Sequence, residues 1–196
     1  MSDEILELWL EELLATPGLT AIADLAAARR MLVDDALKAV PFVREIEGAV
    51  VDVGSGGGSP GLPLARALPD RRFVLLESQR RKCDFLRRVS AQLPNVEVVW
   101  GRAESRATEE FAVALAKALA KPPVAAELCL PLVRQAGVAI LWAGESADAA
   151  AVADVAEQVG GMLETEADGL LVLRKVAPTP PGFPRRPGMA KKRPLA

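Results

Sequence analysis

Apolar residues follow two spacings that alternate along most of the chain. Short, nearly continuous apolar runs predict buried strands, and apolar residues three to four positions apart predict amphipathic helices. We expect strands at residues 50–53, 72–77, 96–100, 111–115, 137–142, 162–166 and 170–176. We expect helices at residues 5–14, 21–40, 62–68, 80–92, 122–133 and 147–159. Pro17-Gly18 and Pro41 are expected to end the first two helices.

This alternation of strands and helices predicts an α/β fold of the Rossmann-like, doubly wound kind with a mostly parallel sheet. Asp168-Gly169, a hairpin dipeptide, joins the last two strands, so the sheet should close on an antiparallel strand. We expect a single domain at 1–176, with N-terminal helices at 1–41 and an α/β core at 49–176. The remaining residues, 177–196, form a basic tail rich in proline and glycine that is expected to lack regular structure.

The bulk composition is that of one globular domain. The chain has 196 residues, of which 51% are hydrophobic, which suits one sizeable core. No apolar run approaches the roughly 20 residues needed to span a bilayer, and the acidic, amphipathic start differs from a targeting peptide. Cys83 and Cys129 fall in helical patterns and are expected to be reduced core thiols. We therefore expect a cytoplasmic monomer without membrane contact.

Two residue types are missing, because the chain has neither histidine nor tyrosine. Their absence removes the most common general base and the usual metal ligand, so we expect no metal site. The net charge is −2 but unevenly distributed. No acid follows Asp168, whereas seven bases do, namely Arg174, Lys175, Arg185, Arg186, Lys191, Lys192 and Arg193. This part of the chain is expected to contact a polyanion.

The most informative stretch connects the strand at 50–53 with the helix at 62–68. It contains Gly54, Gly56, Gly57, Gly58 and Gly61 within eight residues. Glycines there permit positive φ and let a ligand approach the backbone closely. Residues 56–61 also satisfy the G-x-G-x-x-G pattern of dinucleotide sites, a weak match in a loop so rich in glycine. The loop predicts a nucleotide-containing cofactor beside Gly54, Gly56 and Gly58.

Two carboxylates bear on which cofactor binds. Asp52 precedes Gly54 by two residues, where a carboxylate suits an amine-bearing or cationic ligand and would repel a pyrophosphate. Glu77 ends the next strand, where a ribose diol needs an acceptor. Both NAD and S-adenosyl-L-methionine (AdoMet) have that diol, so Glu77 does not discriminate between them. Asp52 favours AdoMet.

Five longer stretches carry a more specific signal. They are 51–64, in which Pro60-Gly61-Leu62-Pro63 follows the glycine loop, 75–78, 81–86, 101–104 and 183–195. Together they resemble the RsmG/GidB family, AdoMet-dependent enzymes that methylate guanine N7 in 16S ribosomal RNA. The resemblance implies a class I AdoMet-dependent methyltransferase fold, AdoMet as cofactor, and 16S rRNA or the small ribosomal subunit as partner.

The resemblance also assigns residues by position. Gly54 and Ser59 would line the cofactor, and Ala103 and Glu104 match the family's adenine-side pair. Lys117 falls where the family typically has an arginine near the sulfonium and the target base, which implies that it positions the reactants for catalysis. RNA contacts are expected from the tail residues Arg185, Arg186, Lys191, Lys192 and Arg193.

The chain departs from the family pattern at Ala112, where the family has an acid, and at Lys117. The family's N-terminal segments are also reduced. These departures motivate an alternative in which the protein binds AdoMet with little activity and serves as an RNA or ribosome-assembly binding module. A third hypothesis, an NAD-dependent oxidoreductase, lacks the proton donor that histidine or tyrosine would supply.

The missing residue types agree with transfer to a ring nitrogen. Guanine N7 has a free lone pair and no proton, so methylation requires positioning and no general base. Exocyclic amino-group transfer usually uses an Asn/Asp-Pro-Pro-aromatic loop, and Ala120-Lys121-Pro122-Pro123 lacks both the polar acceptor and the aromatic residue. Transfer to carbon 5 needs a cysteine nucleophile, and both cysteines are expected in the core.

Overall fold

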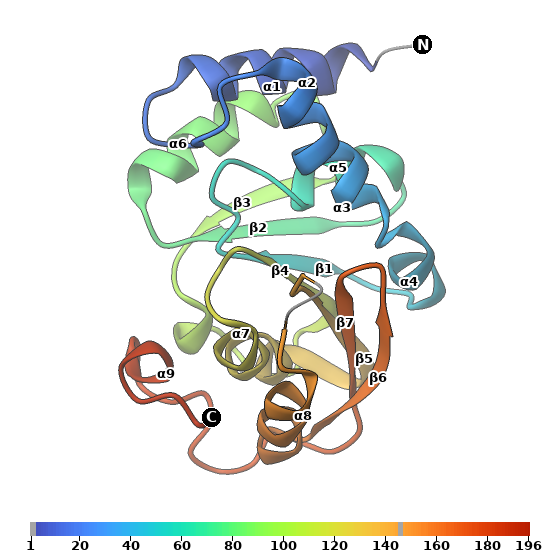
Figure 1. Cartoon of the computed structure of the whole chain (residues 1–196), viewed down its shortest axis with the longest axis vertical. Coiled ribbons are helices and arrows are strands. Elements are labelled where there is room, and N and C mark those ends of the chain that lie inside the picture. Colours follow the sequence, from blue (N-terminus) through green and yellow to red (C-terminus); the bar gives the residue numbers. More distant parts are fainter. Residues whose placement is uncertain (1–2, 145–146) are drawn as a thin grey trace.

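One sheet of seven strands, with helices on both faces, forms the centre of the computed structural model, which describes residues 3–144 and 147–196 (Figure 1). The strands are β1 (Val50–Val53), β2 (Phe73–Glu77), β3 (Val96–Trp100), β4 (Phe111–Lys117), β5 (Val133–Trp142), β6 (Gly161–Ala167) and β7 (Leu170–Lys175). Their order is β3-β2-β1-β4-β5-β7-β6. Strands β1 to β5 are parallel, and β7 pairs antiparallel with both β5 and β6. The predicted fold class is confirmed.

Helices fill most of the connections between the strands. The α-helices are α1 (Glu4–Ala15), α2 (Leu25–Ala28), α3 (Asp35–Leu37), α4 (Val40–Glu45), α5 (Gly61–Ala67), α6 (Arg80–Val89), α7 (Pro122–Cys129), α8 (Ala149–Gln158) and α9 (Met189–Lys192). A π-helical turn, η1 (Arg29–Asp34), and two 3-10 turns, η2 (Ala103–Ser105) and η3 (Leu130–Leu132), complete the set within the described residues. None of the helices described is long and apolar enough to span a membrane.

The sheet has a hydrophobic core on each face. On one face, α7, α8 and α9 cover residues such as Val53, Ala116 and Leu141. On the other face, α4 and α5 pack on the middle of the sheet, and α1 and α6 pack together over β2 and β3 (Figure 1). The pattern follows from strand geometry, because successive residues of a buried strand point to opposite faces and both faces are covered.

The predicted helix at 21–40 is wrong as a single element. Asp24 caps a short helix by accepting hydrogen bonds from the amides of Ala26 and Ala27, and the chain then passes through η1 and α3. Pro41 was expected to end the helix, but it lies in the first turn of α4 instead. Proline is compatible with that place because the first helical amides have no partner within the helix.

Two parallel strands are longer than their apolar runs predicted. Strand β4, expected at 111–115, continues to Lys117, so this lysine lies at a strand end. Strand β5 begins at Val133 rather than at residue 137, because the helix opened by Pro122 ends at Cys129 and a 3-10 turn follows. Ala112, Ala114 and Ala116 are buried in the middle of the sheet, where their small side chains permit close helix packing.

The expectation that the tail lacks regular structure is wrong for Met189–Lys192, which form α9 beside α7 (Figure 1). Ala190 is 2% exposed within the core of that face. Buried apolar surface and paired charges therefore hold this proline-rich segment against the domain. It lies beside the carboxyl-end edge of the sheet, close to the candidate site.

The strand order reverses between β1 and β4, since the chain proceeds outward from β1 through β2 and β3 and then returns to β4 on its other side. In doubly wound sheets, ligands bind at the carboxyl ends of the strands at such a switch point. The glycine loop follows β1, and Lys117 ends β4. Topology therefore brings these two sequence features to one place.

Candidate cofactor site

The glycine loop after β1 has the backbone conformation that its composition predicts. Gly54, Gly56 and Gly58 have φ angles of 73°, 56° and 112°, which other residues adopt only with strain. The amides of Gly54 and Ser55 donate to the Leu76 carbonyl at 2.7 and 3.2 Å. The loop is therefore fastened to the end of β2 and turns its glycines toward the switch point.

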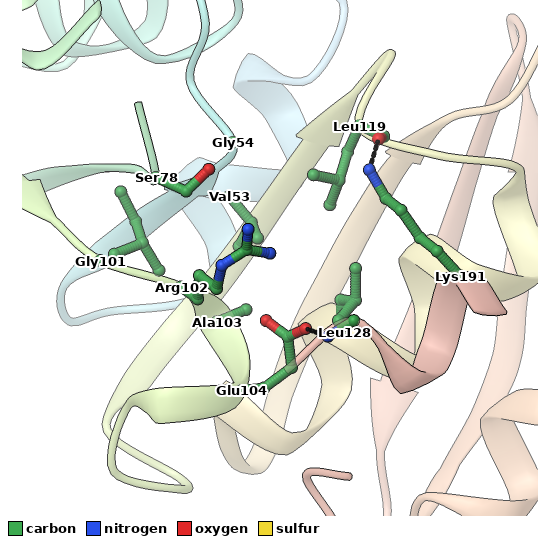
Figure 2. A pocket seen from close by; sticks show the side chains of 12 residues that line it. Val53, Gly54, Ser78, Gly101, Arg102, Ala103, Glu104, Leu119, Leu128 and Lys191 are labelled. Carbon is green, nitrogen blue, oxygen red and sulfur yellow. Dashed lines mark hydrogen bonds between the residues drawn. The ribbon is translucent and has the colours of Figure 1, made fainter. Parts of the chain in front are cut away.

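Two cavities meet at Gly54. The first, the Ala103 pocket, has about 490 Å³ of empty space, and its lining includes Leu76, Ser78, Ala103, Glu104, Leu119 and Lys191 (Figure 2). The second, the Lys117 pocket, has about 730 Å³, and its lining includes Leu13, Leu32, Gly56, Gly57, Ser59 and Lys117. Gly54 lines both, so one elongated ligand could occupy the two cavities together.

The residues at this junction fit AdoMet, which has a flat nucleoside at one end and a charged amino acid at the other. Leu76, Ala103 and Leu119 give the Ala103 pocket apolar walls suited to a heterocycle. A Cβ atom at Gly54 would lie 2.5 Å from Leu119 Cδ1, so the space between the cavities depends on this glycine. Gly56 leaves its surroundings open, with the nearest atom 3.7 Å from an added Cβ.

Asp52 lines neither pocket and binds the backbone where the glycine loop ends. It is 1% exposed, and its Oδ2 accepts a hydrogen bond from the Gly61 amide at 3.1 Å. Burial raises the pKa of Asp52 to about 7, although the Gly61 hydrogen bond opposes the rise. The expected contact of Asp52 with the cofactor stays a prediction. Asp52 joins the end of β1 to the start of α5 and gives no support to the charge-based choice between AdoMet and NAD.

Glu77 also binds backbone amides. One carboxylate oxygen accepts from Gly56 N at 3.0 Å, and the other accepts from Gln79 N at 2.7 Å. The side chain is 5% exposed and stands next to Ser78, which lines the Ala103 pocket. Oε1 also accepts from Ser78 Oγ at 3.4 Å, whereas Oε2 keeps a second lone pair, and the expected acceptance from a ribose diol stays a prediction.

Lys117, which lines the Lys117 pocket, forms an ion pair with Asp35, which lies outside that pocket. Its Nζ lies 2.5 Å from Asp35 Oδ2 and donates also to the Met31 carbonyl. Burial acts to raise the pKa of Asp35, but the hydrogen bonds from Lys117 and Lys38 outweigh it and hold the pKa below its ordinary value. The lysine thereby links β4 to the N-terminal helices.

The predicted cofactor residues divide into those that line a cavity and those that hold its walls. Six line one or both pockets, namely Gly54, Gly56, Ser59, Ala103, Glu104 and Lys117. Asp52, Gly58 and Glu77 line neither. Gly58 serves packing, because a Cβ atom there would lie 2.5 Å from Leu62 Cδ1 and 3.1 Å from Trp9 Nε1.

Comparison with known proteins identifies the family. A family model described as GidB, rRNA small subunit methyltransferase G, matches residues 5–166. The chain belongs to the GidB family. A ribosomal RNA small subunit methyltransferase G of Moorella thermoacetica is 36% identical over 198 residues, covering 91% of this chain and 82% of the relative. Its namesake in Thermotoga sp. strain RQ2 is 35% identical, covering 98% and 91%. For a Synechococcus relative, 37% identical, the alignment covers 74% of this chain and 63% of that protein.

Solved structures similar to this GidB-family chain share its fold at low sequence identity. The pyocyanin biosynthetic protein PhzM has a TM-score of 0.63 and 15% identity, covering 85% of this chain and 62% of PhzM. A T. thermophilus 16S rRNA N2 G1207 methyltransferase, RsmC, in complex with AdoMet and guanosine has a TM-score of 0.51 and 14% identity, covering 74% and 40%. The fold is that of class I AdoMet-dependent methyltransferases.

The basic tail of this GidB-family chain does not present all of its cations to solvent. Arg185 was expected to contact RNA, but its guanidinium binds Glu127 through Nε at 2.6 Å and Nη2 at 2.5 Å. Lys191 donates to the Leu119 carbonyl at 3.1 Å. Lys191 is nevertheless exposed, as are Arg186, Lys192 and Arg193. The tail therefore divides into cations that hold it to the domain and cations that face outward.

Sequence reasoning missed several residues around the cavities of this GidB-family chain. Ser78, Gly101 and Leu119 line the Ala103 pocket, and the first two directly follow β2 and β3, a place that could have indicated them. Three indole N–H groups also donate hydrogen bonds to residues that line the cavities, and no sequence motif predicted these bonds. Trp9 donates to Gly57 at 2.8 Å, Trp100 to Ser78 at 3.0 Å and Trp142 to Asp35 at 3.1 Å, each at the backbone carbonyl.

Proposed function

We propose that this protein transfers a methyl group from AdoMet to N7 of a guanine in 16S rRNA. Membership of the GidB family carries the coarser part of the statement, an AdoMet-dependent methyltransferase of small-subunit rRNA. The observation that supports the site is the meeting of two cavities at Gly54, at the switch point of the sheet. AdoMet supplies an activated sulfonium methyl group when it is bound.

The lining chemistry favours one orientation of the cofactor. The apolar slot between Leu76, Ala103 and Leu119 suits the adenine ring. The Lys117 pocket offers the Lys117 ammonium, which keeps a third donor beside those it uses on Asp35 and Met31, and a cation of this kind suits a carboxylate. We assign the nucleoside to the Ala103 pocket and the amino acid to the Lys117 pocket, which leaves the sulfur beside Gly54.

Lys117 separates this site from a third hollow, the acceptor groove, of about 860 Å³. Arg30, Met31, Asp34, Asp35, Lys38 and Lys117 line the groove. We assign the target base to it, because Lys117 borders both the groove and the cofactor cavity. The role of Lys117 is to position the reactants, since attack by the N7 lone pair removes no proton before methyl transfer. The absence of histidine and tyrosine is then no obstacle.

The exposed tail cations give the RNA a sequence-independent contact. Arg186, Lys192 and Arg193 are exposed and stand close to the segment that borders the Ala103 pocket. Such contacts bind phosphates without reading bases, so we assign recognition of the target guanine to the shape of the folded RNA or subunit. We further propose that the protein acts as a cytoplasmic monomer, since both cysteines are buried free thiols and the substrate is intracellular.

Two measurements test the proposal. Calorimetry with AdoMet, S-adenosylhomocysteine (AdoHcy) and NADH should show binding of the first two ligands only. Labelled methyl groups should then enter 16S rRNA or small subunits that lack the mark, and mild reduction followed by aniline should cleave the product at N7-methylguanine. Label that appears in RNA resistant to this cleavage would contradict N7 transfer, and NADH binding without AdoMet binding would contradict the cofactor.

The alternative of a weakly active AdoMet-binding module rests on Lys117, whose ammonium is occupied by Asp35 and the Met31 carbonyl. Lysine also lacks the planar, bidentate geometry of arginine. Under this alternative, AdoHcy binds normally and the protein binds small subunits, but labelled methyl does not enter the RNA. Methyl transfer by the wild-type chain at enzyme-like rates excludes it.

A further inference from the structure

The C-terminal segment at 183–193, here called the strap, crosses one side of the Ala103 pocket. Its Gly188 amide donates to Glu104 Oε1 at 2.8 Å on one side of the cavity. Its Lys191 Nζ donates to the Leu119 carbonyl at 3.1 Å on the other side. Figure 2 shows Lys191 and Glu104 bordering the same space as Ser78 and Gly54, with Arg102 extending into it. The strap therefore spans the cavity and forms part of its wall.

One buried ion pair holds the strap in place. Glu127 of α7 is 3% exposed, surrounded by buried residues such as Ala126 and Leu128. Arg185 reaches it with two hydrogen bonds of 2.6 and 2.5 Å in a bidentate geometry. Release of the strap would leave the Glu127 carboxylate buried without its counter-ion, which is strongly unfavourable. The position of Gly188 and Lys191 is thus coupled to a pair that lies outside the cavity lining.

The strap also has a direct means of contacting a ligand. Gly188 and Lys191 both line the cavity. An ammonium group has three donors, and Lys191 uses one of them on Leu119. The remaining donors suit the ring nitrogens of adenine or the hydroxyl groups of ribose, which are acceptors. Leu119, held by Lys191, lies against Gly54 at the junction of the two pockets.

We propose that the strap is the outer wall of the nucleoside half of the AdoMet site. Lys191 contacts the adenosine moiety, and Arg185 acts as a positioning residue through Glu127. The inference rests on the proposed function, because it takes AdoMet as the ligand of the cavity.

The central test compares AdoHcy with 5′-methylthioadenosine, which contains the adenosine half and lacks the amino acid. Arg185→Gln should weaken calorimetric binding of both ligands by about tenfold, and Lys191→Gln by about threefold. Lys117→Gln, on the amino acid side, should weaken AdoHcy binding and leave methylthioadenosine binding unchanged. Equal loss of both ligands in the strap variants assigns the strap to the nucleoside.

A double variant separates binding from stability. Arg185→Gln alone leaves Glu127 buried and charged, so its melting temperature should fall. Glu127→Gln combined with Arg185→Gln removes both charges and should recover most of that melting temperature, whereas ligand affinity should stay low. Arg174→Gln is the matched control, because Arg174 also forms a two-bond pair, with Glu164 on the β6–β7 hairpin away from the cavities.

The outcomes distinguish two failures. If the wild-type protein binds neither ligand, the proposed function is wrong. If the wild type binds AdoHcy and the Arg185 and Lys191 variants bind both ligands as tightly as the Arg174→Gln control, the strap has no part in the cofactor site and the inference is overturned.

Discussion

At the scale of single residues, three carboxylates near the cofactor cavities bind backbone amides of other segments, and one of them also binds an amide two residues along. Asp52 binds Gly61, Glu77 binds Gly56 and Gln79, and Glu104 binds Gly188. Each joins two segments that the cavity needs in a fixed relation. A carboxylate in this role acts by geometry, and its effect on ligand affinity passes through the backbone that it holds.

Asp52→Asn should change how stability depends on pH. Because the pKa of Asp52 is raised from 3.8 to about 7 by burial, the folded state binds a proton that the unfolded state has released between these values. This group therefore lowers the free energy of unfolding as pH rises from about 4 to 7, by up to about 1.4 kcal/mol per pH unit. Urea titrations across that range should show a shallower decline in the variant. An identical decline in both proteins would mean that Asp52 titrates normally.

Lys117→Gln should separate chemistry from binding of the nucleoside. The variant keeps a polar side chain, one atom shorter, but loses the charge that pairs with Asp35, 29% exposed in its side chain. We expect kcat for methyl transfer to fall by at least about tenfold, which corresponds to about 1.4 kcal/mol of lost positioning. Lys117→Arg provides the comparison, and a rate at or above wild type would support a positioning role. An unchanged kcat in Lys117→Gln would remove Lys117 from the reaction.

Residue types were more predictable than residue partners. The glycine loop could be placed at the site because it follows a strand that the apolar pattern locates, whereas Ser59, Ala103 and Lys117 were assigned by the family resemblance. The partner of Asp52 could not be predicted. Gly61 is the first residue of the seven-residue helix α5, and only the folded loop brings its amide to Asp52. Glu127 is a stronger case, since its partner Arg185 lies 58 residues away in a segment expected to lack regular structure.

At the scale of elements, α1 acts as a cover for the glycine loop. Trp9 of α1 is 2% exposed and donates its indole N–H to Gly57, and Leu13 of the same helix lines the Lys117 pocket. Arg88 of α6 pairs with Glu12, which joins the two helices on that face. The N-terminal helices are therefore part of the cofactor cavity as well as of the core.

Trp9→Phe should weaken AdoHcy binding several-fold while keeping most of the packing. Loss of one hydrogen bond from a buried indole costs about 1 kcal/mol of folding free energy. Chemical denaturation and calorimetry on the same samples measure both effects. Leu10→Val, a change to a fully buried neighbour that lines neither pocket, is the control for packing alone. Equal affinity in wild type and Trp9→Phe would show that the loop does not depend on this bond.

The elements that the sequence predicted well are the strands with continuous apolar runs, such as β1 and β2. These runs are buried on both faces, so their pattern is independent of the helices that cover them. The helix at 21–40 could not be resolved in the same way. Its apolar positions fit one long helix, and they do not reveal that α3 packs against α5 or that Ser59 donates to the Leu32 carbonyl within the π-turn.

At the scale of the whole molecule, the local charge of the tail differs from the net charge of the protein. The net charge of −2 and pI near 5.4 describe an acidic protein, yet the exposed tail cations form a local basic region next to the Ala103 pocket. We propose that a polyanionic RNA approaches by this side. Arg185 and Lys191 hold the strap, and Arg185 contributes less to that attraction because Glu127 neutralises it.

Replacing Arg186, Lys192 and Arg193 together by glutamine should make RNA binding less dependent on salt. Each phosphate contact contributes about 0.7 to the slope of log affinity against log salt for single-stranded RNA, so the slope should fall by about 2. Filter binding to 16S rRNA between about 50 and 300 mM salt, a range over which such contacts become increasingly screened, measures the slope. A variant with the wild-type slope would place the RNA on another face.

The three indole hydrogen bonds have a spectroscopic consequence. The chain contains three tryptophans and no tyrosine, so its intrinsic ultraviolet emission comes from Trp9, Trp100 and Trp142 alone. Their bonds end on Gly57 in the Lys117 pocket, on Ser78 in the Ala103 pocket and on Asp35 in the acceptor groove. Each compartment of the site thus has its own natural fluorophore. Versions of the protein that retain a single tryptophan would report, without any label, which compartment a given ligand has entered and in what order.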